Sequence, residues 1–159
     1  MEITITKDGA AQFRQIPEFL FALLNGLVPA ASVDDPRVEA RLFPLPADED
    51  EESLCEDWSA FVHPDLHATF QAARDTVQAD LRGAKACKRG WAMLVPAGQV
   101  DAWLSVLTQA RLALAELHAL TEKELSEELP AVIENPRDHA RIQMHFYGIV
   151  QEWFVDFAA

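Results

Sequence analysis

Two histidines in this sequence have a spacing that could bind a metal ion. His63 and His67 are four residues apart, which places two imidazoles on one face of an α-helix, as in helical metal sites. Pro64 puts His63 at or before the start of that helix, so the two rings need not converge. No third ligand stands at a characteristic spacing from them. We therefore expect surface histidines and no metal or other cofactor, and we keep His63 and His67 as weak metal candidates.

A positively charged residue inside an apolar stripe is the second feature with chemical potential. Residues 99–120 have the periodicity of an amphipathic helix, at about 100° per residue. Arg111 falls in the middle of the stripe, and His118 lies one heptad further on. A guanidinium cannot be neutralised, so its burial requires a carboxylate partner or a ligand. The apolar members of the stripe are Val100, Trp103, Leu104, Leu107 and Leu114.

Arg111 and His118 could thus anchor either an ion pair or an anionic ligand. Asp80 and Asp156 flank the apolar stripes of their own predicted helices, so either carboxylate could reach inward to Arg111. A structural ion pair is the interpretation that we favour. The alternative is a bound anion or a carboxylate of a partner protein.

The sequence contains no recognisable catalytic motif. It has no Gly-x-Ser-x-Gly elbow and no glycine-rich phosphate loop, and its six glycines are scattered singly. The sequence marks no acidic residue that would orient His139 or His145 as a general base. Cys55 and Cys87 lack a Cys-x-x-Cys arrangement and are expected to be reduced thiols. We expect no catalytic residues, which leans against an enzyme.

The charge balance disfavours two classes of partner. The chain has 13 Lys and Arg against 26 Asp and Glu, a net charge of −13, which repels phosphate backbones and anionic lipid. We therefore predict neither nucleic-acid nor membrane binding. One basic cluster falls where a helix should end and would complement the helix dipole. It consists of Arg82, Lys85, Lys88 and Arg89.

A run of five adjacent carboxylates is expected to form an exposed acidic loop over residues 45–53, because such a run cannot share a helix comfortably. The alternative is that the run docks onto a basic partner surface. The run consists of Asp48, Glu49, Asp50, Glu51 and Glu52. No signal peptide or membrane-length apolar run is visible, so we expect a cytoplasmic protein. The sequence leaves the oligomeric state open.

The elements that position these residues indicate an α+β protein. Residues 3–16 alternate as a β-hairpin, and the uncharged residues 91–95 read as one further, well-covered strand. Helices are predicted at residues 17–26, from Asp35 to before Pro44, from Pro64 to Gly83 or Gly90, and from Asn135 to the end. Shorter helical stretches are expected around residues 54–62 and 121–130. We predict one globular domain over residues 1–159, mainly α with a small three-stranded antiparallel sheet: a helical bundle packed on an N-terminal hairpin plus one further strand.

Three segments resemble an uncharacterised family. They are RLFP at residues 41–44, AWLSVLTQARLAL at residues 102–114, and an aromatic C-terminal helix that contains Gln151 and Glu152. The family is mostly actinobacterial, and its domain has no known function. Its genes often lie beside that of ClpS, the adaptor that delivers substrates to the Clp protease, and some members carry a "transcriptional regulator" label. The resemblance implies no catalytic residues.

The sequence alone does not identify the function, and it leads to three hypotheses. The first is a non-catalytic protein-interaction or regulatory module, which the resemblance would link to regulated proteolysis. The second is a transcriptional regulator, against which the net charge argues. The third is a small histidine-dependent enzyme or metal-binding protein that uses the histidines near residues 63–67 or 139–145.

Overall fold

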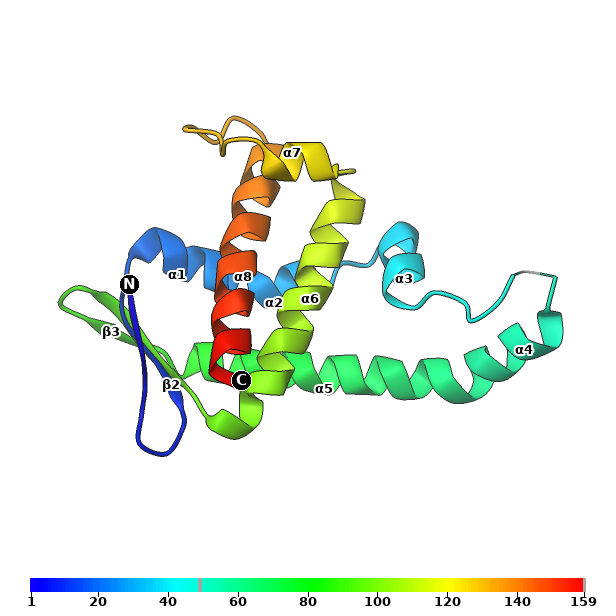
Figure 1. The fold of residues 1–159 in the computed structure, drawn as a ribbon, viewed down its shortest axis with the longest axis horizontal. Helices are drawn as coiled ribbons and strands as arrows, with labels where there is room; N and C mark the ends of the chain where they lie inside the picture. The colour runs from blue at the N-terminus through cyan, green and yellow to red at the C-terminus, as the bar shows by residue number, and fades with distance from the viewer. Residues whose placement is uncertain (49, 159) are drawn as a thin grey trace.

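The computed structural model describes residues 1–48 and 50–158, so Glu49 of the acidic run lies outside the described residues. A small antiparallel sheet lies at one end of the molecule, with helices packed against it (Figure 1). The strands are β1 (Glu2–Ile5), β2 (Ala11–Ile16), β3 (Lys85–Cys87) and β4 (Gly90–Val95), in the spatial order β1-β2-β4-β3. The expected α+β class, mainly helical with an N-terminal hairpin, is confirmed.

The sheet has one strand more than the sequence suggested. β1 and β2 form the predicted hairpin, and β4 pairs with β2 as expected. The additional strand, β3, pairs with the outer edge of β4 and includes Lys85 of the basic cluster. The expectation of three strands was wrong because this strand has three residues, all exposed, and so carries no alternation of apolar and polar residues.

A bulge in β2 is matched by a glycine in β4. The register between these strands shifts between Phe13 and Ile16, and Gln15 in the bulge has a φ of 51°. Gly90 has a φ of +104°, and a Cβ there would lie 2.1 Å from the carbonyl oxygen of Ile16. Only glycine allows the two backbones to approach this closely.

The helices lie in the predicted segments, except for a short helix at residues 27–31 that the sequence did not indicate, and some helices have side-chain caps. Thr121 and Glu124 form a capping box, and Asn135 Oδ1 accepts a hydrogen bond from the Asp138 backbone N–H at 2.9 Å. The helices are α1 (Glu18–Asn25), α2 (Leu27–Ala31), α3 (Pro36–Leu42), α4 (Glu52–Asp57), α5 (His63–Arg82), α6 (Val100–Leu117), α7 (Glu122–Ser126) and α8 (Pro136–Ala158), with a π-helical turn η1 (Trp58–Val62) and a 3₁₀ turn η2 (Ala97–Gln99).

The core lies where α6 and α8 meet the sheet. The ring of Phe13 in β2 lies 5.7 Å from that of Trp153 and 5.9 Å from that of Phe154, both in α8. The ring of the fully buried Trp103 of α6 lies 5.7 Å from that of Phe154. These aromatic contacts join the sheet to the two helices, each of which stacks its apolar stripe inward. No helix in the described residues is long and apolar enough to cross a membrane.

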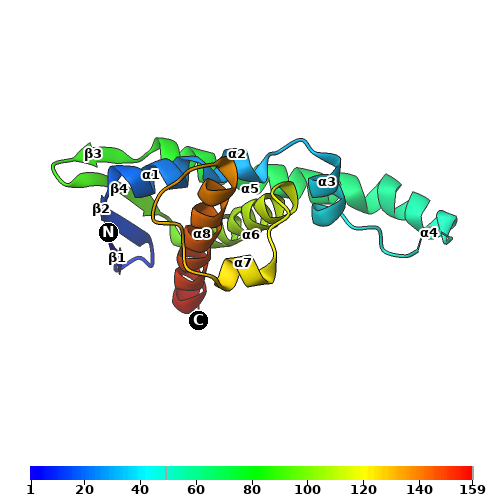
Figure 2. The same cartoon turned by 90° about the horizontal axis from the view of Figure 1, so that it is seen from above.

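The segment from α4 to α5 forms one continuous helical rod whose outer end projects beyond the other helices (Figures 1 and 2). We call residues 45–48 and 50–62 the arm. Each residue of α4 and η1 is described, and none of them is buried. The expected loop at residues 45–53 gives way to helix at Glu52.

A π-helical turn forms the inner end of the arm and leads into α5. Pro64 has no backbone N–H, and in a regular helix its ring would clash with the carbonyl of residue 60. The wider turn of η1, which ends two residues before Pro64, relieves this conflict. The helix therefore continues through a proline at which the sequence suggested a new start.

Candidate functional site

Glu39, His63 and His67 meet between α3 and the long helix. Oε1 of Glu39 lies 3.2 Å from Nε2 of His63 and 2.9 Å from Nε2 of His67. The expectation that the rings need not converge was wrong, because His63 begins α5 in helical geometry and so shares a face with His67. Sequence reasoning missed Glu39, which belongs to another helix and has no fixed spacing to the histidines.

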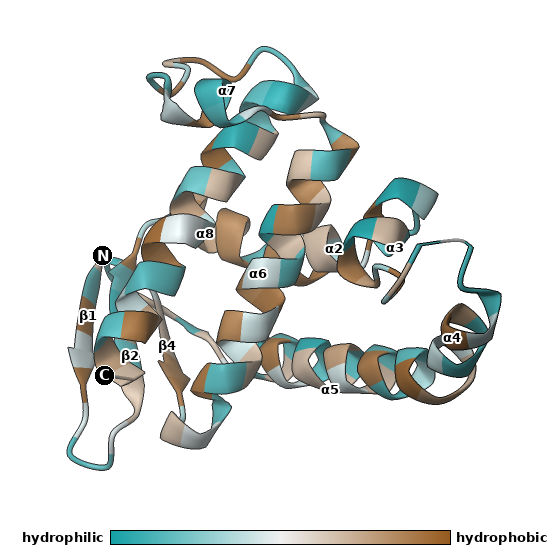
Figure 3. Ribbon diagram, turned by 45° about the vertical axis from the view of Figure 1, so that its right-hand side comes forward, coloured by the Kyte–Doolittle hydropathy of each residue, from teal (hydrophilic) through white to brown (hydrophobic). Residues whose placement is uncertain are grey.

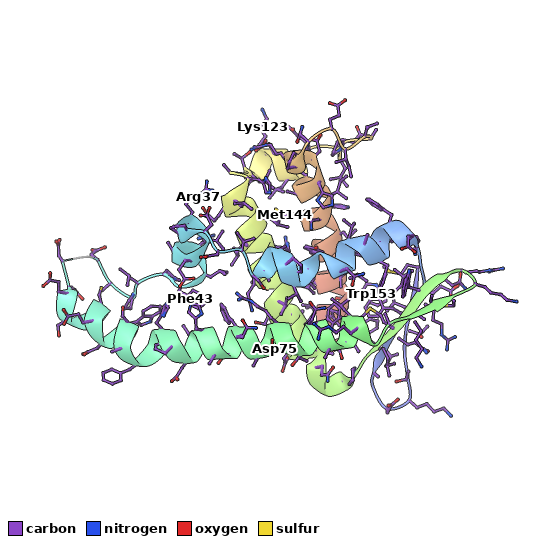
Figure 4. All side chains as sticks on the ribbon, turned by 180° about the vertical axis from the view of Figure 1, so that it is seen from behind. Arg37, Phe43, Asp75, Lys123, Met144 and Trp153 are labelled. Carbon is purple, nitrogen blue, oxygen red and sulfur yellow. The ribbon has the colours of Figure 1, made fainter. Side chains whose placement is uncertain are left out.

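Aromatic rings hold this cluster in place. Phe43, which is 5% exposed, stacks on His67 with a centroid distance of 4.3 Å and an interplanar angle of 9°. The ring of Trp58 meets His63 edge-on at 5.3 Å. Figure 4 shows Phe43 in the space between α3 and the long helix. The two imidazoles are therefore restrained on the sides that do not face Glu39.

The carboxyl group of Glu39 is held in its charged form. Desolvation, the largest single influence, opposes ionisation, but the hydrogen bonds and charges of His67 and then His63 together lower the pKa of Glu39 below its usual value. One oxygen and two nitrogens, all within 4.8 Å of one another, form a donor set that can bind a divalent cation.

Arg111 lies half-buried on α6, and its partner is an amide. Its Nη1 donates a hydrogen bond of 2.7 Å to Oε1 of Gln151 on α8, and its Nε is buried without a partner. No carboxylate lies within 4.0 Å of Arg111 in the part of the chain that the structure describes. Asp80, a suggested partner, instead accepts a hydrogen bond of 2.8 Å from Trp103 Nε1, and Asp156 is exposed.

Arg141 of α8 was missed by sequence reasoning and resembles Arg111 in its environment. Its Nη2 donates to the carbonyl oxygens of Glu124 and Glu128, at 2.9 and 3.1 Å, while its Nε is buried without a partner. Arg111 and Arg141 line one cavity of about 330 Å³ between α6, α7 and α8. Its other walls include Leu125, Met144, His145, Gly148, Ile149 and Glu152. The cavity is thus lined by two guanidinium groups and two carboxylates. Glu124 pairs with Arg137, and Glu152 has no ion pair among the described residues.

His118 does not line this cavity but ends α6. Its carbonyl oxygen accepts a hydrogen bond from Nη1 of Arg137, whose Nη2 also pairs with Glu124. Desolvation lowers the pKa of the His118 imidazole, and the charges of Arg137 and His139 lower it further. Arg137, rather than His118, joins the end of α6 to the capping box of α7.

The acidic run continues into a longer stretch without cations. Residues 42–73 contain eight acidic residues and no lysine or arginine. The described members of the run are all exposed: Asp48, Asp50, Glu51 and Glu52. The arm therefore carries strong negative charge along with its apolar side chains.

Comparison with known proteins places the chain in a family. No curated protein and no solved structure matches it. Residues 3–158 match the sequence model of the family described as a domain of unknown function, DUF2017. The match spans the sheet, the arm and both candidate sites. The chain therefore belongs to the DUF2017 family.

Proposed function

We propose that this DUF2017 protein is a non-catalytic interaction module whose arm docks onto a protein surface that combines basic and apolar residues. The observation that carries this proposal is the exposure of large apolar side chains on the arm. Phe61 is 72% exposed and Leu54 is 49% exposed. Both lie in the helical stretch that the sequence predicts around residues 54–62, yet both side chains face solvent. Figure 3 shows hydrophobic segments at the outer end of the arm.

Burial of these side chains would favour association. An aromatic side chain buries roughly 150–250 Å², and each Å² of apolar surface removed from water contributes about 25 cal/mol. The arm also presents Leu45 and Val62, 49% and 43% exposed. A few such anchors supply most of the binding free energy in ordinary interfaces.

The charge of the arm specifies the kind of partner. Eight acidic residues without a lysine or arginine over residues 42–73 attract a basic surface and repel an acidic one. This attraction would accelerate association at low salt, and screening would weaken it as salt rises. A nucleic acid has the wrong sign of charge for the arm.

Regulated proteolysis is the setting that we propose for this interaction, within the cytoplasm. The support is the resemblance to actinobacterial proteins encoded beside the ClpS adaptor. An adaptor or regulator needs a surface that binds another protein and needs no catalytic group. A role in transcription would have to be exerted through a protein partner, because the net charge of −13 opposes direct binding to DNA.

A photo-crosslinking amino acid at position 61, in full-length protein added to native extract, would identify the partner. The captured protein is then purified and titrated with wild type, Phe61→Ala and Glu51→Gln/Glu52→Gln. Phe19→Ala is the matched control, since Phe19 is 50% exposed on α1, outside the arm. We expect at least a tenfold loss of affinity, about 1.4 kcal/mol, for the arm variants and none for Phe19→Ala. Equal affinities, or crosslinks only to a second copy of this chain, would contradict the proposal.

A second candidate function is the binding of a carboxylate or phosphate group in the cavity between α6, α7 and α8. The specific observation is the buried, unpartnered Nε of both Arg111 and Arg141. A buried donor without a partner is costly, so an anion that accepts from both would be held strongly. Such an anion would have to compete with the carboxylate of Glu152.

Thermal denaturation with added phosphate or succinate would test this second candidate. We expect saturable stabilisation of wild type that Arg141→Gln abolishes and Arg14→Gln, an exposed arginine of β2, leaves unchanged. Glu152→Gln should strengthen anion binding by removing the competitor. If wild type shows no saturable stabilisation, ordered water or Glu152 satisfies the two guanidinium groups and no anion site exists.

A further inference from the structure

We infer that Glu39, His63 and His67 form a Zn²⁺ site that joins α3 to the root of the arm. The inference does not depend on the proposed function, since it concerns different residues and a different ligand. It rests on the convergence of three donor atoms from two helices.

The separations of the donor atoms fit a zinc ion. Zn–N and Zn–O bonds of about 2.0–2.1 Å in tetrahedral geometry put neighbouring ligand atoms roughly 3.3 Å apart. Oε1 of Glu39 lies 3.2 Å from the Nε2 of His63 and 2.9 Å from the Nε2 of His67. All three atoms lie within 4.8 Å of one another. Small rotations of the side chains would therefore complete the site, without movement of the backbone.

The chemistry of the donor set favours zinc over the hard cations. Two imidazoles and one carboxylate suit Zn²⁺, whereas Mg²⁺ and Ca²⁺ prefer oxygen ligands alone. The side chains of His63, His67 and Glu39 are 30%, 46% and 50% exposed, so a fourth ligand can be water from the solvent. Three protein ligands and one open position resemble the arrangement of catalytic rather than structural zinc sites.

The rings are oriented in advance by groups that do not bind the metal. Phe43 stacks on His67, and Trp58 meets His63 edge-on, so both Nε2 atoms stay directed at Glu39. Packing of this kind reduces the conformational entropy that metal binding would otherwise have to offset. Each neutral ring must carry its proton on Nδ1, so that the lone pair of Nε2 faces the ion.

A zinc ion would fix the position of the arm. Glu39 belongs to α3, which packs on α6 of the body, and the histidines begin the helix that continues the arm inward. Coordination would close the loop between residues 39 and 63, which includes the acidic run. Zinc binds the folded chain in preference to the unfolded one, so it should raise the thermal midpoint with concentration.

Titration of untagged, full-length apoprotein with ZnCl₂, followed by calorimetry and by metal analysis after dialysis, tests the inference. We expect one Zn²⁺ per chain with a Kd in the micromolar range or tighter. His67→Ala and Glu39→Gln should weaken binding at least tenfold. His139→Ala and His145→Ala are the matched controls, since both remove an exposed histidine of α8, and they should bind as wild type does.

Cobalt provides a second, spectroscopic measurement of the site. Co²⁺ in place of Zn²⁺ should give the visible absorption of a four- or five-coordinate ion, and His67→Ala should abolish it. Wild type that binds no stoichiometric zinc would overturn the inference and leave the cluster as an ion-paired carboxylate. Binding that is lost in His139→Ala or His145→Ala, but kept in His67→Ala, would overturn it as well. Circular dichroism establishes that each variant is folded.

Discussion

The hydroxyl of Tyr147 donates a hydrogen bond of 2.7 Å to the carbonyl oxygen of Leu23, and it thereby ties α8 to α1 across the core. Gln143, one turn earlier in α8, donates to the same hydroxyl at 3.1 Å. The ring is fully buried. Since this is the one tyrosine in the sequence, its ionisation can be observed without interference.

Ionisation of Tyr147 should coincide with alkaline unfolding. Desolvation raises the pKa of Tyr147 from 10.0 to about 12, against the smaller opposite effect of Gln143. Because the folded pKa lies above the unfolded one, this contribution to stability is complete below pH 10 and is lost as the pH rises towards 12. Phenolate absorbance and circular dichroism should change together near pH 12. Phenolate formation near pH 10 in folded protein would contradict the burial.

Tyr147→Phe should lower the free energy of unfolding by about 1 kcal/mol, the net value of a typical buried hydrogen bond. The carbonyl of Leu23 keeps its bond from the Gly26 backbone N–H, whereas the Gln143 amide loses the hydroxyl to which it donates. Urea denaturation at pH 7 measures the change. A loss above about 3 kcal/mol would show that the hydroxyl organises more of the core than these two bonds.

Replacement of Arg111 by leucine should leave stability nearly unchanged. The substitution removes one hydrogen bond, from Arg111 to Gln151, and Gln151 keeps its bond of 2.8 Å to Thr108 Oγ1. The substitution also removes a buried guanidinium Nε that has no partner. We expect a change within about 1 kcal/mol by chemical denaturation, whereas loss of a buried ion pair would cost about 3–5 kcal/mol.

Glu124→Gln should show a pH-dependent effect on stability. Hydrogen bonds from Arg137 and then from Thr121 lower the pKa of Glu124 from 4.5 to about 2. The folded pKa is depressed, so this contribution is complete above pH 4.5 and is lost as the pH falls towards 2. Glutamine can keep the capping geometry, so the difference in stability between wild type and variant measures the contribution of the Glu124 charge.

Thermal midpoints of wild type and Glu124→Gln, measured from pH 7 down to pH 2, should therefore converge in the acid range. Glu122→Gln, in the same helix, is the control because Glu122 is exposed and has no ion pair among the described residues. A constant difference between wild type and Glu124→Gln over the whole range would refute the electrostatic explanation.

Substitution by alanine should have opposite effects on stability at two glycines, Gly90 and Gly98. At Gly90 a Cβ would collide with the Ile16 carbonyl in a left-handed backbone, so we expect a loss of at least about 3 kcal/mol. At Gly98 nothing lies within 4 Å of a Cβ and φ is ordinary, so alanine should be neutral or stabilise by up to about 1 kcal/mol. Denaturation midpoints distinguish the two, and similar losses at both positions would contradict the bulge geometry.

Features that depend on neighbours in the sequence were predictable. Asp35, Thr121 and Asn135 each cap a helix within four residues, and the alternation of Ile3 and Ile5 defines the first strand. These signals are local, since each cap bonds to a backbone N–H in the first turn of its own helix. The α+β class follows from them.

Features that depend on distant neighbours were not predictable. Glu39 joins His63 across 24 residues, and Arg141 meets the Arg111 cavity from another helix. The helical spacing of apolar residues such as Leu54 and Phe61 also does not determine whether another part of the fold packs on them. Tertiary packing decides both questions, and periodicity carries no information about it.

The π-helical turn at Trp58–Val62 determines the direction in which the side chains of α4 point relative to α5. Each residue in a helix advances the side-chain direction by about 100°, so one residue added to or removed from this turn would re-aim the apolar face of the arm by that amount. The core would remain as it is, since none of the residues in the turn is buried. The direction in which α4 presents Leu54 is thus set by the length of this turn.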